Sequence, residues 1–101
     1  PYEAEWAKNI YWMYGVVVQP EFGITRDQLM ERLHADGIDT RTFFCPMNQQ
    51  PCLQSRQGFR AVPCPVADGL WENGLYLPST YTLSEETIEQ IADAVRLAHR
   101  N

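Results

Sequence analysis

Apolar residues follow two different patterns along this chain, and together they predict a small sheet covered by helices. Residues 10–18 (IYWMYGVVV) are almost all apolar, which is typical of a central strand covered on both sides or of a strand half covered by another domain. Within this strand Gly15 predicts a bulge or a close backbone approach. Residues 38–45 alternate in character, as a strand with two different faces does. A third, short strand is expected at 75–77, where Pro78 ends it because proline has no N–H to donate.

Three helices are predicted from the spacing of apolar residues and from residues that favour helix ends. The first begins at Thr25, which has capping-box spacing to Gln28. Ile24 and Leu29, on either side of this start, have the spacing of a hydrophobic staple. Gly37 is expected to end the helix, because glycine adopts the positive φ that many helix ends require.

The second helix is expected to begin at Pro65 and end at Gly74, and the third to begin after the N-cap residue Ser84. The inner face of the second helix is expected to consist of its apolar residues Val66, Ala67, Leu70 and Trp71. The order of strands and helices predicts a single domain over residues 1–101. We expect a two-layer α+β fold, with a small, mostly antiparallel sheet of about three strands and helices packed on it. We assign Trp12 and Tyr14 to its core.

Composition restricts the classes of partner that this domain can bind. The net charge is −5 and the sequence pI is about 4.8, which argues against nucleic acids and anionic membranes as ligands. No apolar run approaches the roughly 20 residues that cross a bilayer. The three cysteines are odd in number and lack the spacing of a zinc site, so we expect reduced thiols in a cytoplasmic protein.

The residues with most binding potential gather around the end of the second predicted strand. Arg41 offers a fork of donors to a carboxylate or a phosphate, and the proline-bounded loop after the strand carries Asn48, Gln49 and Gln50. Such amides donate to and accept from sugar hydroxyls. This arrangement is typical of the rim of a polar ligand site, and it is equally compatible with one edge of a small domain.

Five blocks of sequence, in this order, resemble the sugar aminotransferases of the DegT type, near the perosamine synthases. They are 9–14 (NIYWMY), 26–29 (RDQL), 37–44 (GIDTRTFF), 45–51 (CPMNQQP), and 64–67 (CPVA) through 74–79 (GLYLPS). Each block alone is weak, and together they span nearly the whole chain.

The resemblance covers only the C-terminal small domain of those enzymes and implies the fold of the small domain of fold-type I aminotransferases. In the family a large N-terminal domain holds pyridoxal phosphate (PLP) on a lysine, and the enzyme is a homodimer. The reaction moves an amino group, usually from glutamate, onto a keto sugar linked to a nucleotide. The resemblance places Lys8, the only lysine here, outside the cofactor segment, so we expect an exposed side chain and no activity of this chain alone.

Given this resemblance, we expect Arg41, Phe43, Asn48, Gln49 and Gln50 to contribute to substrate binding. For Arg41 the alternative is a surface ion pair with Asp39, and for the three amides it is a solvated loop. Phe43 and Phe44 should point to opposite faces of their strand, and we expect Phe44 in the core and Phe43 at an interface or pocket wall.

Many members of the family carry a histidine where this chain has Asn48. An amide does not titrate near neutral pH, so this difference argues against proton transfer at that position. No residue of the chain is expected to be catalytic or to bind a cofactor or metal.

The sequence leaves two other functions open. One is a stand-alone module that binds a sugar nucleotide or a partner protein without catalysis, which the complete set of helix-end signals favours. The other is a structural domain without a ligand. Calorimetry with nucleotide sugars and co-purification with a partner protein distinguish the two.

Overall fold

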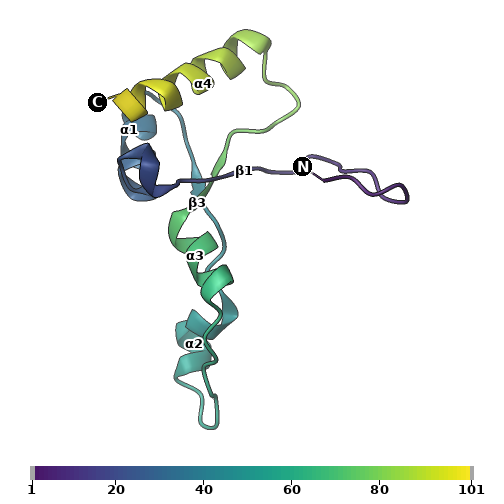
Figure 1. The fold of residues 1–101 in the computed structure, drawn as a ribbon, viewed down its shortest axis with the longest axis vertical. Coiled ribbons are helices and arrows are strands. Elements are labelled where there is room, and N and C mark those ends of the chain that lie inside the picture. The colour runs from purple at the N-terminus through teal and green to yellow at the C-terminus, as the bar shows by residue number, and fades with distance from the viewer. Residues whose placement is uncertain (1, 101) are drawn as a thin grey trace.

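The computed structural model describes residues 2–100 (Figure 1). The elements are β1 (Tyr14–Val17), the 3₁₀ turn η1 (Pro20–Phe22), α1 (Arg26–Ala35), β2 (Arg41–Thr42), the 3₁₀ turn η2 (Met47–Gln49), α2 (Pro51–Gln54), α3 (Pro65–Asn73), β3 (Gly74–Leu77) and α4 (Glu85–Arg100). The predicted three-stranded, mostly antiparallel sheet with helices is confirmed. The loop expected at 46–51 is instead coiled into η2 and the start of α2, where Pro51 occupies a first helical position that needs no N–H.

The sheet has the order β1-β3-β2 and is antiparallel throughout. β3 is therefore the central strand. Of the two alternatives for 10–18, the central strand is wrong, and a strand half covered by another domain stays a prediction. β1 lies at an edge and covers only the four residues that face β3, from the pair Tyr14 and Leu77 to the pair Val17 and Gly74. β2 is shorter than predicted for the same reason, because only Arg41 and Thr42 lie opposite β3.

One face of the sheet carries the hydrophobic core. Leu75 of β3 is fully buried and packs with Leu29 and Leu33 of α1 and with Ala98 of α4. Successive residues of a strand point to opposite faces, so Val16, which is paired with Leu75, faces the same helices. In Figure 1, α1 and α4 lie together on this side of the sheet.

The opposite face of the sheet carries the remaining residues of each strand. Gly15, Arg41 and Tyr76 are in register across the three strands, which places them side by side on this face. Phe43 packs onto them, and a Cβ at Gly15 would lie only 3.0 Å from its ring. The close approach at Gly15 is therefore made by a side chain and not by backbone as predicted. We call this surface the open face, because α1 and α4 cover the other side.

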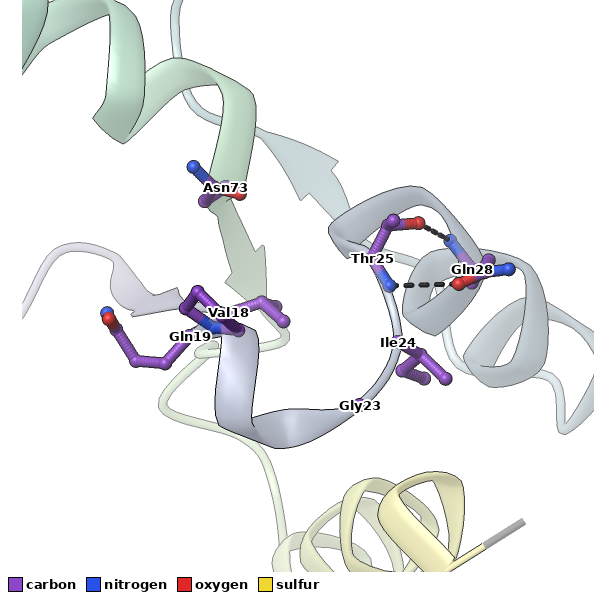
Figure 2. A pocket seen from close by; sticks show the side chains of 8 residues that line it. Val18, Gln19, Gly23, Ile24, Thr25, Gln28 and Asn73 are labelled. Carbon is purple, nitrogen blue, oxygen red and sulfur yellow. Dashed lines mark hydrogen bonds between the residues drawn. The ribbon is translucent and has the colours of Figure 1, made fainter.

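Helix α1 begins and ends as its sequence predicts. The Thr25 hydroxyl accepts from the Gln28 backbone N–H at 3.2 Å, and the Gln28 side chain accepts from the Thr25 N–H at 2.9 Å, which completes the capping box (Figure 2). Gly37, just beyond the helix, has φ of 78°. The Ser84 hydroxyl likewise accepts from the Thr87 N–H at the start of α4.

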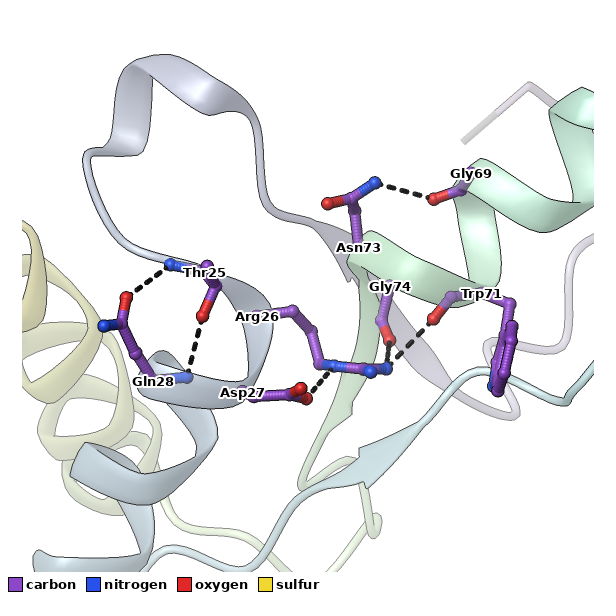
Figure 3. A network of polar contacts seen from close by, with 8 residues as sticks. All are labelled: Thr25, Arg26, Asp27, Gln28, Gly69, Trp71, Asn73 and Gly74. Atoms are coloured by element: carbon purple, nitrogen blue, oxygen red, sulfur yellow. Dashed lines mark hydrogen bonds and ion pairs between the residues drawn. The ribbon is translucent and has the colours of Figure 1, made fainter.

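Two arginines of α1 hold the ends of other helices. The guanidinium of Arg26 is only 12% exposed and donates to the carbonyls of Trp71 and Gly74 at the end of α3 (Figure 3). Arg32 donates to the carbonyl of Ala98 near the end of α4 at 2.7 Å. Positive groups at helix C-termini satisfy free carbonyls and oppose the negative end of the helix dipole.

Helix α3 does not have the predicted inner face. None of its residues is buried, and Val66 and Leu70 are exposed. Figure 1 shows the reason: α3 joins the beginning of β3 and extends away from α1 and α4, beside α2, so no helix of the core lies over it. Trp12 and Tyr14 were also assigned to the core, yet both are exposed, because they precede or begin an edge strand.

The space around the Cα of Gly74 is too small for any other residue type. A Cβ there would overlap the Phe43 ring and the backbone carbonyl of Leu70, whereas a Cβ on Gly69 in α3 would meet nothing within 4 Å. We expect Gly74→Ala to lower the free energy of unfolding by about 1–3 kcal/mol through overpacking. The control Gly69→Ala should raise it by about 0.5–1 kcal/mol, because alanine favours the helix. Urea unfolding measures both, and equal stability of the two variants would contradict the close packing.

The Arg26 contacts give a second prediction. Arg26→Lys keeps the charge but loses the planar fork that reaches two carbonyls, so the free energy of unfolding should fall by about 1–3 kcal/mol. The control is Arg41→Lys, whose guanidinium is 79% exposed, and which should change stability by less than about 0.5 kcal/mol. An Arg26→Lys protein as stable as the control in urea would rule out this role.

Candidate functional site

A cavity of about 360 Å³ opens on the open face of the sheet. Residues of β2 and the chain after it form one side of it, and Met13, Trp71 and Tyr76 complete the lining, which is in full Met13, Arg41, Thr42, Phe43, Phe44, Cys45, Trp71 and Tyr76. The cavity therefore brings together two of the predicted site residues, Arg41 and Phe43, with aromatic side chains from α3 and β3. We refer to it as the aromatic cavity.

Its aromatic wall is built on Tyr76. The rings of Phe43 and Tyr76 have centroids 4.6 Å apart and planes tilted by 31°, and Phe44 lies 6.3 Å from Tyr76. Phe43 is half-buried at the pocket wall, as predicted. The prediction that Phe44 belongs to the core is wrong, because its side chain is 74% exposed. Phe44 follows the end of β2, so the alternation of faces no longer directs it toward the helices.

Arg41 presents its charge at the rim of the aromatic cavity. Its guanidinium lies 3.6 Å from the carboxylate of Asp39, and both side chains are almost fully exposed. An exposed pair of this kind contributes little to stability. The guanidinium is therefore free to exchange Asp39 for an anionic ligand at small cost.

The three predicted amides lie in a separate cluster beside this cavity. Asn48 and Gln49 donate to the Oδ1 of Asp68 in α3, at 3.2 and 2.6 Å, while Gln50 donates to the carbonyl of Cys45 at 2.9 Å. The amide groups are thus used within the protein, and the alternative of a solvated loop is wrong for them, since all three residues are half-buried. Two of them meet one carboxylate, which also accepts weakly from the backbone N–H of Cys64.

Sequence reasoning missed Asp68. It lies among apolar residues of α3, one turn before Trp71, and its only signal is that a single acid interrupts the expected inner face. The hydrogen bond from Gln49 is the main cause that lowers the pKa of Asp68 below its ordinary 3.8, with further donors in Asn48 and Cys64, while desolvation acts in the opposite direction. The Oδ1 of Asn48 is buried without a hydrogen-bond partner.

Comparison with known proteins identifies the family. The profile of the DegT/DnrJ/EryC1/StrS aminotransferase family matches residues 2–96. The chain belongs to this family. It is 27% identical over 86 residues to a GDP-perosamine synthase of Vibrio cholerae, and 30% identical over 95 residues to one of Caulobacter vibrioides. These alignments cover 85% and 94% of the chain but only 23% and 25% of the relatives, so the chain spans about a quarter of their length.

A solved structure has the same fold. Helicobacter pylori PseC, an aminotransferase involved in the biosynthesis of pseudoaminic acid, superposes with a TM-score of 0.76 at 24% identity. The superposition covers 87% of this chain and 23% of that one. The predicted resemblance to sugar aminotransferases and the α+β fold are both confirmed.

Other features of this family member lie away from the aromatic cavity. A larger, mostly apolar groove of about 570 Å³ runs between β1 and α4, and a cavity of about 280 Å³ lies beside the capping box of α1 (Figure 2). Cys45, Cys52 and Cys64 are free. Within residues 2–100, no three His, Cys, Asp or Glu residues gather as a metal site would require, and no helix is long and apolar enough to cross a membrane.

The lowered pKa of Asp68 predicts a pH dependence. Its hydrogen bonds stabilise the folded chain fully above the ordinary pKa of 3.8 and are lost as pH falls through the lower pKa of the folded state. Asp68→Asn should therefore be less stable than the parent at pH 7, and the difference should shrink as the pH falls below 3.8. Urea unfolding at several pH values measures this. A difference that stays constant down to pH 2, or one no larger than that of the exposed control Asp93→Asn, would contradict it.

Proposed function

We propose that this chain is the C-terminal small domain of a PLP-dependent aminotransferase that acts on a nucleotide-linked keto sugar. The amino group comes from glutamate, and the product is an amino sugar of the perosamine type. The observation that supports this most strongly is the alignment to a GDP-perosamine synthase, which covers 94% of the chain at 30% identity. The family match over residues 2–96 agrees with it.

In this proposal the aromatic cavity forms part of the substrate site. Arg41 binds a phosphate of the nucleotide sugar in place of Asp39, since a guanidinium fork matches phosphate geometry. Phe43, Phe44 and Tyr76 supply apolar surface on which a sugar ring or a base packs. Asn48, Gln49 and Gln50 support the rim, and their bonds to Asp68 and Cys45 argue against direct contact with the sugar.

The residues of this chain do not fit PLP. The cofactor needs a lysine with a lowered pKa inside a phosphate-binding site, whereas Lys8 is exposed and lines none of the cavities described above. We therefore assign PLP, and the catalytic lysine, to a large N-terminal domain, and we expect the isolated chain to be inactive. A homodimer in the cytoplasm is part of the same proposal.

Exposed apolar side chains support a large partner surface. Tyr81 is 99% exposed, and Trp6 and Phe44 are also largely exposed. Scattered apolar residues are normal on a surface, but so many large aromatic ones are typical of an interface. The large domain or the second subunit is the expected partner.

The reverse reaction tests the proposed function. The longer protein, supplied with PLP, GDP-perosamine and 2-oxoglutarate, should release glutamate, because the amino group of the sugar moves to the keto acid. The isolated 101-residue chain should release none under the same conditions. Glutamate formation by the isolated chain, or its absence with the longer protein, would overturn the proposal.

The role of Arg41 can be tested in the same assay. Removing a charge-assisted contact to phosphate costs about 1.5–3 kcal/mol, so Arg41→Ala should raise KM for GDP-perosamine roughly 10- to 100-fold with a much smaller change in kcat. The control is Arg60→Ala, which removes an exposed arginine in the segment between α2 and α3. Equal KM values for the two variants would exclude Arg41 from the substrate site.

A further inference from the structure

The two walls of the aromatic cavity are supported in different ways. Phe43 is fixed by the sheet: its N–H donates to the carbonyl of Gly74 at 3.1 Å, and its ring packs onto Gly15 and Gly74. The opposite wall includes Trp71, which belongs to α3, a helix without a single buried residue. Hydrophobic burial therefore does not set the position of this second wall.

Polar contacts at the two ends of α3 take the place of a packed core. At the end of the helix, Arg26 donates to the carbonyls of Trp71 and Gly74 (Figure 3). Near its beginning, the carboxylate of Asp68 accepts hydrogen bonds from the side-chain amides of Asn48 and Gln49 in η2. Asp68 precedes Trp71 by three residues, so both side chains lie on the same side of the helix.

The segment that reaches Asp68 is also tied to the first wall. Gln50 donates back to the carbonyl of Cys45, which is itself a lining residue of the aromatic cavity. The segment from Phe43 to Gln50 thus begins in the first wall, and its hydrogen bonds to Asp68 connect it to α3, the helix that contains Trp71. The Asp68 carboxylate therefore adds a connection near the beginning of α3 to the one that Phe43 makes with Gly74 at its end.

We propose that Asp68 is a positioning residue that sets the distance between Trp71 and the wall formed by Phe43, Phe44 and Cys45. This inference rests on the proposed function for its consequence in substrate binding, while the contact itself is a property of this chain. Asp68 touches no ligand in this proposal and takes no part in proton transfer.

The pattern of donors explains why this position holds a carboxylate. Gln49, Asn48 and the backbone of Cys64 all direct N–H groups at Asp68, and a carboxylate offers two acceptor oxygens and no donor. An asparagine there would turn its NH₂ group against one of these donors. The hydrophobic core of Leu29, Leu33 and Leu75 lies on the other face of the sheet, so its packing does not depend on this contact.

An exchange of partners tests the proposal. Asp68→Asn and Gln49→Glu, made singly, create a donor–donor and an acceptor–acceptor contact at the 2.6 Å hydrogen bond. The double variant restores one donor and one acceptor in reversed order. The amide oxygen at position 68 then takes the place of Oδ2, which already lies 3.5 Å from the Asn48 amide nitrogen and can accept from it. Each single variant should raise KM for GDP-perosamine about tenfold with kcat changed less than twofold, and the double variant should return KM to within about threefold of the parent.

The control is Asp93→Asn, which makes the same Asp-to-Asn change in an exposed pair with Arg96 on α4. It should leave KM unchanged. A single variant with parental KM, or a double variant no better than the worse single one, would overturn the proposal. Asp68→Asn removes a negative charge and Gln49→Glu adds one, so an effect of charge alone would not raise KM in both single variants.

Hydrogen exchange on the 101-residue chain tests the positioning role of Asp68 without depending on the proposed function. Asp68→Asn should speed exchange of the backbone amides of Gln49, Gln50 and Trp71 at least fivefold and leave those of Leu33 and Leu75 protected. The double variant should restore the parental rates. Unchanged exchange in Asp68→Asn would refute the positioning role even if the longer protein is an aminotransferase. Restored exchange would support that role even if GDP-perosamine is not a substrate.

Discussion

The carbonyl of Gly74 is the point on which the arrangement of this domain depends. It accepts the N–H of Phe43 and a guanidinium N–H of Arg26, so β2 and α1 both meet the chain where α3 becomes β3. One residue earlier, the carbonyl of Asn73 accepts the N–H of Val18 after β1. There is no room for a side chain at this junction, because a Cβ at residue 74 would overlap the Phe43 ring. Only glycine fits there.

The two faces of the sheet follow from this junction. Because the register is fixed at Gly74, Leu75 must point into the core with Leu29 and Leu33, and Tyr76 must point to the open face with Arg41. A shift of one residue would exchange these roles and bury the arginine. The aromatic cavity and the core are therefore two consequences of one register.

Local signals in the sequence predicted local structure well. The capping box of Thr25, the positive φ of Gly37 and the cap at Ser84 depend on neighbours within four residues, and all three formed as predicted. The family resemblance correctly predicted the α+β fold and the similarity to sugar aminotransferases. Arg41 and Phe43 line one cavity, since both belong to one short strand and its immediate continuation, while their contact with a substrate stays a prediction.

Errors arose where the outcome depends on distant segments. Apolar residues of α3 looked like a core face, but the helix extends away from α1 and α4, and nothing in its spacing reveals that direction. Likewise, Asn48 and Gln49 find Asp68 about twenty residues away, a contact that hydrogen-bonding capacity alone does not predict. Phe44 was wrongly predicted to lie in the core. β2 ends at Thr42, so the alternation of side chains between the two faces of the sheet does not extend to residue 44.

The structure of the proposed longer aminotransferase with PLP and GDP-perosamine bound would test the central claim most directly. The account predicts that the nucleotide sugar lies against the open face, with a phosphate within hydrogen-bond distance of Arg41 and a ring packed on Phe43 or Phe44. A nucleotide sugar held entirely by the rest of the protein, with Arg41 still paired to Asp39 and the open face turned away from the ligand, would contradict it.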